Sequence, residues 1–318
     1  MCLYPKILRN KKYTMNKKNG GVVPPIKDKR TKFVPVGCGK CIECRKQKAR
    51  NWQVRLTEDL RENKNGKFIT LTFNDHELRK LESEIKGLKG YDLDNEVCRL
   101  AVRRFTERWR KKYKKTIRHW LVTELGGNNT ERVHMHGIVW TDNVEDLEDK
   151  WKYGKIWIGQ YVNEKTVNYI VKYVNKIDKK HKEYNSKIFS SKGIGSGYIS
   201  RRDSERNKYK KGKTVETYKT RSGIEMALPI YYRNKIYSEE EKELLWIEKL
   251  DKNERWVCGV KVDISNGYDE YDELLKRKQK ENKRLGYGDD SINWELKKYE
   301  QERRNLKKQE RWAKIKNP

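Results

Sequence analysis

Residues 117–124, IRHWLVTE, and residues 132–140, RVHMHGIVW, decide the fold of this chain. Both stretches are rich in β-branched and aromatic residues, so each predicts a strand. Between them lies GGNN at residues 126–129, and glycine and asparagine are residues that tight turns favour. The two strands are therefore expected to form an antiparallel hairpin.

Further elements are expected on both sides of this hairpin. KFITLTF at residues 67–73 predicts a strand, and residues 96–115 predict a helix. After the hairpin, we expect a short helix at 144–152, a strand at 155–162 and a helix at 166–177. The first six elements follow the order of the split βαβ, or ferredoxin-like, pattern. The sequence therefore predicts an α+β fold, an antiparallel sheet with helices on one face.

The chain is expected to divide into four segments. Residues 1–66 form a basic N-terminal extension with a cysteine cluster, and residues 67–178 hold the predicted sheet. Residues 179–237 are a basic extension rich in glycine and tyrosine. Residues 238–318 are dominated by charged side chains, which predicts a mainly helical or partly disordered tail.

Composition limits the class of protein. The 318 residues include 76 Lys and Arg but only 46 Asp and Glu, and the formal net charge of +30 indicates a polyanionic partner such as nucleic acid. No apolar run approaches the roughly 20 residues that a membrane span needs, and the N-terminus lacks the apolar segment of a signal peptide. Six cysteines in this length are too few for a disulfide scaffold. We therefore expect a cytoplasmic nucleic-acid protein with no membrane partner.

His134 and His136 lie on either side of a single residue within the second hairpin strand. Alternate residues of a strand point to the same face, so the two imidazoles are expected side by side, within reach of one cation. The hairpin returns Glu124 beside this pair, and Glu131 is the alternative carboxylate. This ligand set suits Mg²⁺ or Mn²⁺ better than structural Zn²⁺. The competing interpretation is a pair of surface histidines without a metal.

Two tyrosines and two lysines share one side of the expected helix at 166–177. Tyr169 and Tyr173 are four residues apart, so their side chains are neighbours on one helix face. Lys172 and Lys176 each follow a tyrosine by three residues and lie along the same side. This arrangement places two phenol hydroxyls beside cations. The competing interpretation places both tyrosines in the core or at an interface.

Cys38, Cys41 and Cys44 form a C-x₂-C-x₂-C cluster, which is a candidate second metal site. Three thiolates could hold Zn²⁺ together with a fourth ligand. The candidates for that fourth ligand are Cys2, Cys98, Cys258 and His76. The spacing also resembles part of an iron–sulfur motif. The alternative is a set of buried, reduced thiols.

Basic side chains offer a surface for single-stranded nucleic acid, because Lys and Arg contact phosphates while Trp and Tyr stack on bases. The basic face of the helix at 96–115 and the loop at 206–221 are candidates for this surface. The individual DNA-binding candidates are Arg103, Arg104, Arg108, Lys111, Lys112 and Lys176. A solvated helix face is the alternative for each.

Together these motifs resemble a known family, the two-tyrosine rolling-circle replication initiators of the HUH endonuclease class. An HxH strand followed about 35 residues later by YxxKYxxK on a helix is typical of that class, and the sequence is similar to the initiators of microviruses, especially the gokushovirus-like branch. The matching stretches are CGKCIECRKQKARNW at 38–52, FITLTFND at 68–75, TELGGNNTERVHMHGIVW at 123–140, WKYGKIWIG at 151–159 and YIVKYVNK at 169–176. The resemblance covers roughly residues 30–180 and continues more loosely to about 237.

The resemblance implies an HUH/RRM-like core at 67–178 and a tyrosine nuclease mechanism. The implied ligands of a divalent cation are His134, His136 and Glu124. Tyr169 or Tyr173 would attack the scissile phosphate, giving a 5′-phosphotyrosine and a free 3′-OH, with Lys172 positioning the phosphate. The implied partners are single-stranded DNA with a viral replication origin, a host helicase and a host DNA polymerase, in the cytoplasm of a bacterial host.

Two other functions remain open at this point. One is a non-catalytic single-strand nucleic-acid-binding protein on the same sheet, which would need neither the HxH strand nor the tyrosine helix. The other is an HUH relaxase or transposase that mobilises a plasmid or another element. The paired tyrosines favour the replication type.

Overall fold

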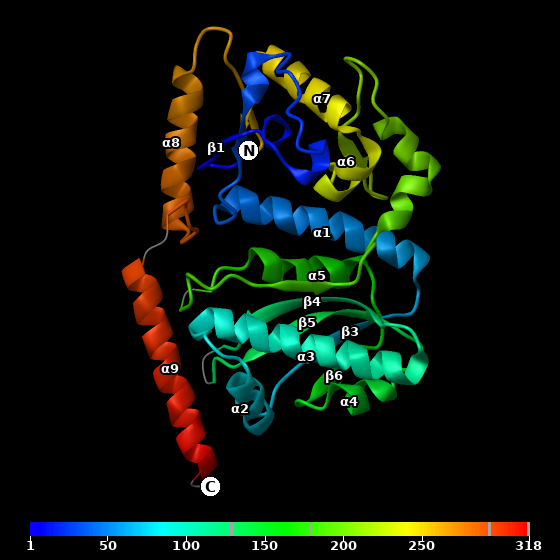
Figure 1. Ribbon diagram of the computed structural model, residues 1–318, viewed down its shortest axis with the longest axis vertical. Helices are drawn as coiled ribbons and strands as arrows, with labels where there is room; N and C mark the ends of the chain where they lie inside the picture. The colour runs from blue at the N-terminus through cyan, green and yellow to red at the C-terminus, as the bar shows by residue number, and fades with distance from the viewer. Residues whose placement is uncertain (128–129, 179, 292–293, 317–318) are drawn as a thin grey trace. The chain divides into compact units, whose positions relative to one another are not determined.

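The chain divides into two compact units. The computed structural model describes residues 1–127, 130–178, 180–291 and 294–316 (Figure 1). The first unit consists of Met1–Asn51 with Tyr198–Ile292, and the second unit consists of Trp52–Gly197 with Asn293–Pro318. Helix α1 (Ile42–Glu62) contributes residues to both units.

The second unit is built on a five-stranded sheet. Its elements after α1 are β3 (Gly66–Leu71), α2 (Asp75–Glu84), α3 (Gly90–Tyr113), β4 (Arg118–Leu125), β5 (Val133–Trp140), α4 (Asp146–Trp151), β6 (Ile156–Ile158), α5 (Glu164–Asn175), β7 (Ile188–Ser190) and α9 (Trp294–Lys316). The strand order is β6-β3-β5-β4-β7, and every neighbouring pair is antiparallel. The crossovers β3-α3-β4 and β5-α4-β6 interleave, as the split βαβ pattern requires. The predicted α+β class and antiparallel sheet are confirmed.

The two faces of this sheet carry different residues because alternate side chains of a strand point in opposite directions. Val133 and Met135 of β5 belong to the main core, together with apolar side chains of α2, α3 and α4. His134 and His136 of β5 point to the other face, which α5 covers (Figure 1). The expectation of helices on one face thus holds for α2, α3 and α4. Helix α5 lies on the opposite face because its own apolar stripe, which includes Val167 and Ile170, is buried there.

Gly137 explains why the HxH pair is followed by glycine. A Cβ atom at this position would lie 2.0 Å from the carbonyl oxygen of Trp120 on the neighbouring strand. No side chain fits at that distance, so glycine lets β4 and β5 approach each other directly after the histidines.

Several element boundaries differ from the sequence expectations. The helix expected at 96–115 begins earlier, at Gly90, and the strand expected at 155–162 is only Ile156–Ile158. Helix α2 and strand β7 were not predicted, because α2 has few apolar positions and β7 is too short for a periodic pattern. Of the expected 126–129 turn, Asn128 and Asn129 lie outside the described residues.

Helix α9 belongs to the part of the chain that was expected to be an exposed or partly disordered tail. Several of its charged side chains are instead buried against the second unit. Arg304 is 1 % exposed, donates to Asp94 at 2.6 Å, and also donates to the carbonyl oxygen of Glu131 at 2.7 Å. Lys308 is buried as well and pairs with Glu82 at 2.6 Å and with Asp94 at 3.1 Å. No helix among the described residues is long and apolar enough to cross a membrane.

Replacing Arg304 with alanine is expected to destabilise the second unit by about 3–5 kcal/mol, because removing one partner leaves the buried Asp94 carboxylate undercompensated. Burial opposes ionisation of Asp94, but the charges of Arg304 and Lys308 outweigh it and lower its pKa. Chemical denaturation of the full chain measures this loss, with the exposed α9 residue Gln309→Ala as the matched control. An equal, small effect of both substitutions would contradict a structural role for the pair.

The first unit consists of short elements around a small core. These are β1 (Lys6–Arg9), the 3₁₀ helices at Lys11–Tyr13, Lys17–Asn19 and Lys29–Lys32, β2 (Phe33–Val36), the 3₁₀ helices at Ser196–Ser200 (from Tyr198) and Arg202–Asn207, β8 (Thr217–Lys219), β9 (Glu225–Ala227), α6 (Ile230–Ile236), α7 (Glu239–Asp251), β10 (Glu254–Val257), β11 (Val260–Asp263) and α8 (Asp269–Arg284). The strands pair as three separate two-stranded sheets, β1-β2, β8-β9 and β10-β11. Ser238 caps α7, as its sequence predicts.

Candidate active site

Three side chains from the central hairpin converge on one point. Glu124 of β4 lies directly opposite His134 of β5, and His136 follows two residues later on the same face. The Oε2 atom of Glu124 lies 3.3 Å from His134 Nε2 and 3.1 Å from His136 Nε2, and the two Nε2 atoms are 3.0 Å apart. The sequence prediction that this residue set comes together is therefore matched by the geometry, and the three could hold a metal ion.

The outer ring nitrogens of both histidines have hydrogen-bond partners of their own. His136 Nδ1 lies 3.0 Å from Thr70 Oγ1, and His134 Nδ1 lies 3.2 Å from the carbonyl oxygen of Arg132. A carbonyl oxygen only accepts, so His134 carries its proton on Nδ1 in this contact. Its Nε2 lone pair then points inward, as it does in metal-ligating histidines with such a partner. Two nitrogen lone pairs and a carboxylate facing one another need a cation or a proton between them, so the residues fit a divalent cation.

The spacing of the three ligand atoms indicates which coordination fits. Neighbouring ligands of an octahedral ion with bonds of about 2.1 Å are about 3.0 Å apart, and this holds for Mg²⁺. Tetrahedral Zn²⁺ with similar bonds would spread its ligands to about 3.4 Å. The observed separations of 3.0, 3.1 and 3.3 Å lie closer to one face of an octahedron. Such a face leaves the remaining positions for water and a phosphate.

The second carboxylate oxygen of Glu124 is held by α5. Lys176, one residue beyond the helix, forms an ion pair with Glu124 Oε1. Burial opposes ionisation of Glu124, but hydrogen bonds from His134, His136 and Lys176 outweigh it and lower its pKa. The carboxylate is therefore charged at neutral pH, which a metal ligand requires.

The two tyrosines of α5 lie beside this cluster. The ring of Tyr173 stacks on His136 with centroids 4.4 Å apart and an interplanar angle of 11°. Its hydroxyl donates to the hydroxyl of Tyr169 at 2.6 Å. Burial, the contact with Tyr169 and the negative charge of Glu124 raise the pKa of Tyr173, so this phenol is neutral near neutral pH. Tyr169 is 48 % exposed, which is unusual for a tyrosine that only fills a core.

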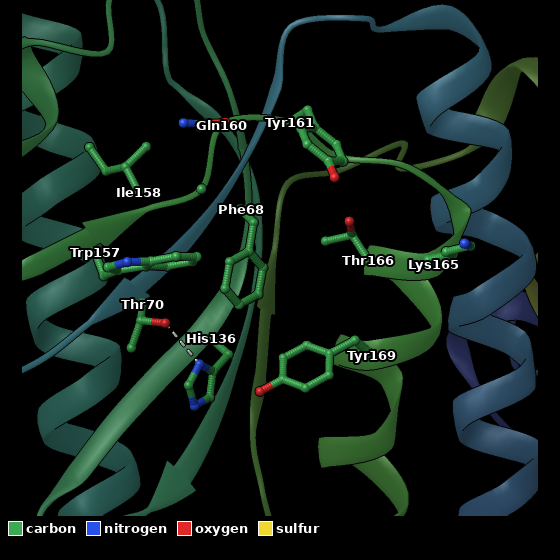
Figure 2. Close-up of a pocket in the computed structure, with 11 residues that line it drawn as sticks. Phe68, Thr70, His136, Trp157, Ile158, Gln160, Tyr161, Lys165, Thr166 and Tyr169 are labelled. Atoms are coloured by element: carbon green, nitrogen blue, oxygen red, sulfur yellow. Dashed lines mark hydrogen bonds between the residues drawn. The ribbon is translucent and has the colours of Figure 1, made fainter.

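An open pocket of about 820 Å³ adjoins the tyrosines and His136 (Figure 2). Aromatic side chains line much of it, and they come from strands β3 and β6 and from the segment that leads into α5. The lining residues are Phe68, Thr70, His136, Trp157, Ile158, Gly159, Gln160, Tyr161, Lys165, Thr166 and Tyr169. Trp157 is 59 % exposed and meets Phe68 edge-on at 5.4 Å. Figure 2 shows the hydroxyl of Tyr169 on the side of its ring that faces His136.

The remaining lysine candidates of α5 occupy different settings. Lys172 is exposed, one residue before Tyr173 along the helix. Lys176 is engaged by Glu124 and also lies 5.8 Å from the centroid of the Tyr173 ring. Lys165, at the start of α5, lines the pocket and was not singled out from the sequence. A cationic edge therefore follows the helix from the pocket to the Glu-His-His cluster.

The structure does not bring the basic residues of α3 to this site, because α3 packs on the opposite face of the sheet. Arg103, Arg104, Arg108, Lys111 and Lys112 are the residues concerned. Arg104 pairs with Glu84 at 3.0 Å, and Lys112 pairs with Asp146 at 2.6 Å. Arg108 donates to the carbonyl oxygens of Lys150 and Trp151, so it holds α4 in place.

Glu131, the alternative carboxylate, faces away from the histidine pair. It is buried against α9, where it pairs with Lys307 at 2.7 Å, and its carboxylate lies 3.0 Å from His181. Its backbone has a φ of 49°, which turns the chain just before β5. This leaves Glu124 as the carboxylate of the site.

The cysteine cluster of the first unit gains a fourth thiol. Cys2 joins Cys38, Cys41 and Cys44, and the four sulfur atoms lie within 4.8 Å of one another. Of the other candidates for a fourth ligand, Cys98 is buried in the main core, Cys258 packs beside the cluster without joining it, and His76 is exposed on α2.

Several site residues were missed from the sequence although strand alternation could have found them. Phe68 and Thr70 alternate on β3, and Thr70 is the direct cross-strand neighbour of His136. Trp157 occupies the same face on β6, opposite Thr70. In the sequence these residues look like ordinary strand formers, so only the register of the sheet marks them as site residues.

Comparison with known proteins identifies one family. Residues 66–178 match the model of a family of replication-associated proteins of the ORF2 type. This range contains β3 through α5, so it includes the Glu-His-His cluster and both tyrosines. The match supports a relation to rolling-circle replication initiators. No curated protein and no solved structure matches the chain.

Proposed function

We propose that this protein initiates rolling-circle DNA replication as a metal-dependent endonuclease and strand transferase. The observation that carries the proposal is the stacking of Tyr173 on the metal-binding face of the sheet, with its hydroxyl bonded to that of Tyr169. Two phenol nucleophiles thus lie beside three side chains that can hold a cation. The match of residues 66–178 to a replication-associated family supports the same conclusion.

The proposed reaction transfers a phosphate from DNA to tyrosine. A divalent cation held by Glu124, His134 and His136 supplies a Lewis acid for the scissile phosphate. The phenol oxygen of Tyr169 or Tyr173 attacks phosphorus, the bond from phosphorus to the 3′ oxygen breaks, and that oxygen takes up a proton. The products are a 5′-phosphotyrosine and a 3′-OH.

Subsequent steps follow from these products. The 3′-OH is a primer for a host DNA polymerase, and a host helicase separates the strands at the viral origin in the bacterial cytoplasm. The phosphotyrosine conserves the bond energy, so attack by a 3′-OH on the same phosphorus releases tyrosine and rejoins the strand. Exposed Lys172 is positioned to contact the phosphate, and Lys165 is positioned to contact the DNA backbone at the pocket.

A covalent adduct is the direct test of this function. The full chain is incubated with circular single-stranded DNA from its own genome and Mn²⁺, then denatured, and DNA that stays with the protein is measured. Trypsin cleaves after Lys165, Lys172 and Lys176, so TVNYIVK (166–172) and YVNK (173–176) separate the two tyrosines. We expect DNA on one or both of these peptides, and none when a chelator replaces Mn²⁺.

Two outcomes distinguish the alternatives. Tight DNA binding without any adduct would favour the non-catalytic binding protein. An adduct on a peptide other than these two would keep a tyrosine or serine nuclease but refute the assignment of the α5 tyrosines.

Trp157→Ala is expected to weaken binding of single-stranded DNA by roughly 5- to 100-fold, because loss of one base–aromatic stack costs about 1–3 kcal/mol. Fluorescence anisotropy at fixed ionic strength measures this affinity, since phosphate contacts make it salt-dependent. The matched control is Trp256→Ala, another half-exposed tryptophan, on β10 of the first unit. If both substitutions weaken binding equally, the pocket has no special role in holding DNA.

A further inference from the structure

The sulfur atoms of Cys2, Cys38, Cys41 and Cys44 surround one point in the first unit. Cys2 Sγ lies 3.8 Å from Cys41 Sγ, and Cys38 Sγ lies 4.0 Å from Cys44 Sγ. All four sulfurs are within 4.8 Å of one another, and all four cysteines are free thiols. Cys2 reaches the cluster from the other end of a segment that contains strands β1 and β2. Bringing it there requires this whole segment to fold.

The distances fit one tetrahedral ion. Zn–S bonds of about 2.3 Å place the corners of a tetrahedron about 3.8 Å apart. The two distances above, 3.8 and 4.0 Å, agree with that spacing. A disulfide would need about 2.05 Å, and a multi-iron cluster places several atoms between its thiolates. A ring of four sulfurs at this spacing is therefore the donor set of a single thiophilic ion.

Backbone N–H groups point at these sulfurs. Cys2 Sγ accepts from the N–H of Tyr4 at 3.3 Å and from the N–H of Cys38 at 3.2 Å. Cys38 Sγ accepts from the N–H of Cys41 at 3.3 Å. A neutral thiol is a weak acceptor, whereas a thiolate accepts charge-assisted hydrogen bonds. These donors therefore favour the deprotonated sulfur that binds metal.

The local backbone is shaped around the sulfurs. A Cβ atom at Gly37 would lie 3.0 Å from Cys44 Sγ, so a side chain there would press on the cluster. Gly39, between Cys38 and Cys41, has a φ of +77°, a conformation that side chains rarely adopt. Helix α1 begins at Ile42, so Cys38 and Cys41 lie on the turn before the helix and Cys44 lies in its first turn. A helical reading of residues 38–44, with three thiols in line, does not apply.

The surrounding core is too small to hold this region alone. Its buried apolar residues are Leu3, Cys41, Val257, Val262 and Leu274. Small domains with so few buried side chains usually depend on a metal or a disulfide. We propose that Cys2, Cys38, Cys41 and Cys44 bind one structural Zn²⁺ ion that fastens the N-terminus to the start of α1. This site is separate from the Glu-His-His cluster and does not depend on the proposed nuclease function.

The metal content of the purified full chain tests this proposal. After dialysis under reducing conditions, mass spectrometry of the metal is expected to find one Zn²⁺ per chain. Cys38→Ser and Cys44→Ser are expected to lose it. Two controls are expected to keep it: Cys258→Ser, whose thiol is half-buried beside the cluster, and His136→Ala, which removes a ligand of the other site.

A second measurement avoids variants that fail to fold. In the wild-type protein, the four cluster thiols are expected to resist a thiol reagent until a chelator removes the metal. Replacement of Zn²⁺ by Co²⁺ is expected to give the visible spectrum of a tetrahedral four-thiolate site. Reduced protein without metal, a disulfide within the cluster, bound iron, or zinc that disappears with His136→Ala and not with Cys38→Ser would each overturn the proposal.

Discussion

Replacing His136 with alanine is expected to reduce DNA nicking by about 10³-fold or more while leaving DNA binding within a few-fold of the wild type. The side chain supplies one of three ligands for the cation, and Lewis-acid stabilisation of a developing phosphate charge contributes several kcal/mol, with each 1.36 kcal/mol worth tenfold in rate. His136 also stacks on Tyr173, so the same substitution loosens the nucleophile. Binding relies on phosphate contacts and stacking elsewhere, which the substitution does not remove.

The measurement is nicking of circular single-stranded DNA under single-turnover conditions, alongside binding to the same DNA. His76→Ala is the matched control, because His76 is an exposed histidine on α2, on the far side of the sheet. Calorimetric titration with Mn²⁺ separates the two roles of His136, since loss of a ligand weakens cation affinity. Unchanged nicking, or a loss of binding as large as the loss of nicking, would contradict a role in catalysis.

Strand periodicity was sufficient to find the Glu-His-His cluster. The period of two fixes that His134 and His136 share a face, and the hairpin places Glu124 directly opposite His134. The helical period in the same way placed Tyr169 and Tyr173 together. What the sequence could not provide is the face of the sheet on which each helix packs. The basic stripe of α3 was therefore expected to bind DNA although it lies across the sheet from the site.

Long-range contacts account for most of the other differences. Cys2 completes the cysteine cluster from 36 residues before Cys38, and four candidates for that role could not be ranked by spacing. Glu131 was the alternative metal ligand until the structure placed it against Lys307 of α9. The charge of α9 itself suggested a solvated tail, yet Arg304 is buried with an acidic partner on α3. Composition describes how polar a segment is, and it does not reveal whether its charges find buried partners.

The Tyr169→Phe/Tyr173→Phe double variant is expected to lose the covalent DNA adduct entirely, a decrease of about 10⁴-fold or more, because no nucleophile remains at the site. Phenylalanine keeps both rings, so the packing against His136 and Phe68 is retained. Each single variant is expected to keep an adduct. The two hydroxyls are 2.6 Å apart, so either occupies nearly the position from which the other would attack.

The single variants test why the chain carries two tyrosines. While one is joined to DNA, only the other can cleave the regenerated origin, so each single variant is expected to nick once and fail to release a closed circle. Multiple-turnover assays that count closed circles per protein measure this difference, and Tyr161→Phe, at an exposed tyrosine of the pocket, is the control. If one single variant matched the wild type in closed circles, the proposed alternation between the tyrosines would be wrong. If the double variant still formed the adduct, the nucleophile would lie elsewhere, and the 2.6 Å contact would be only a packing interaction on α5.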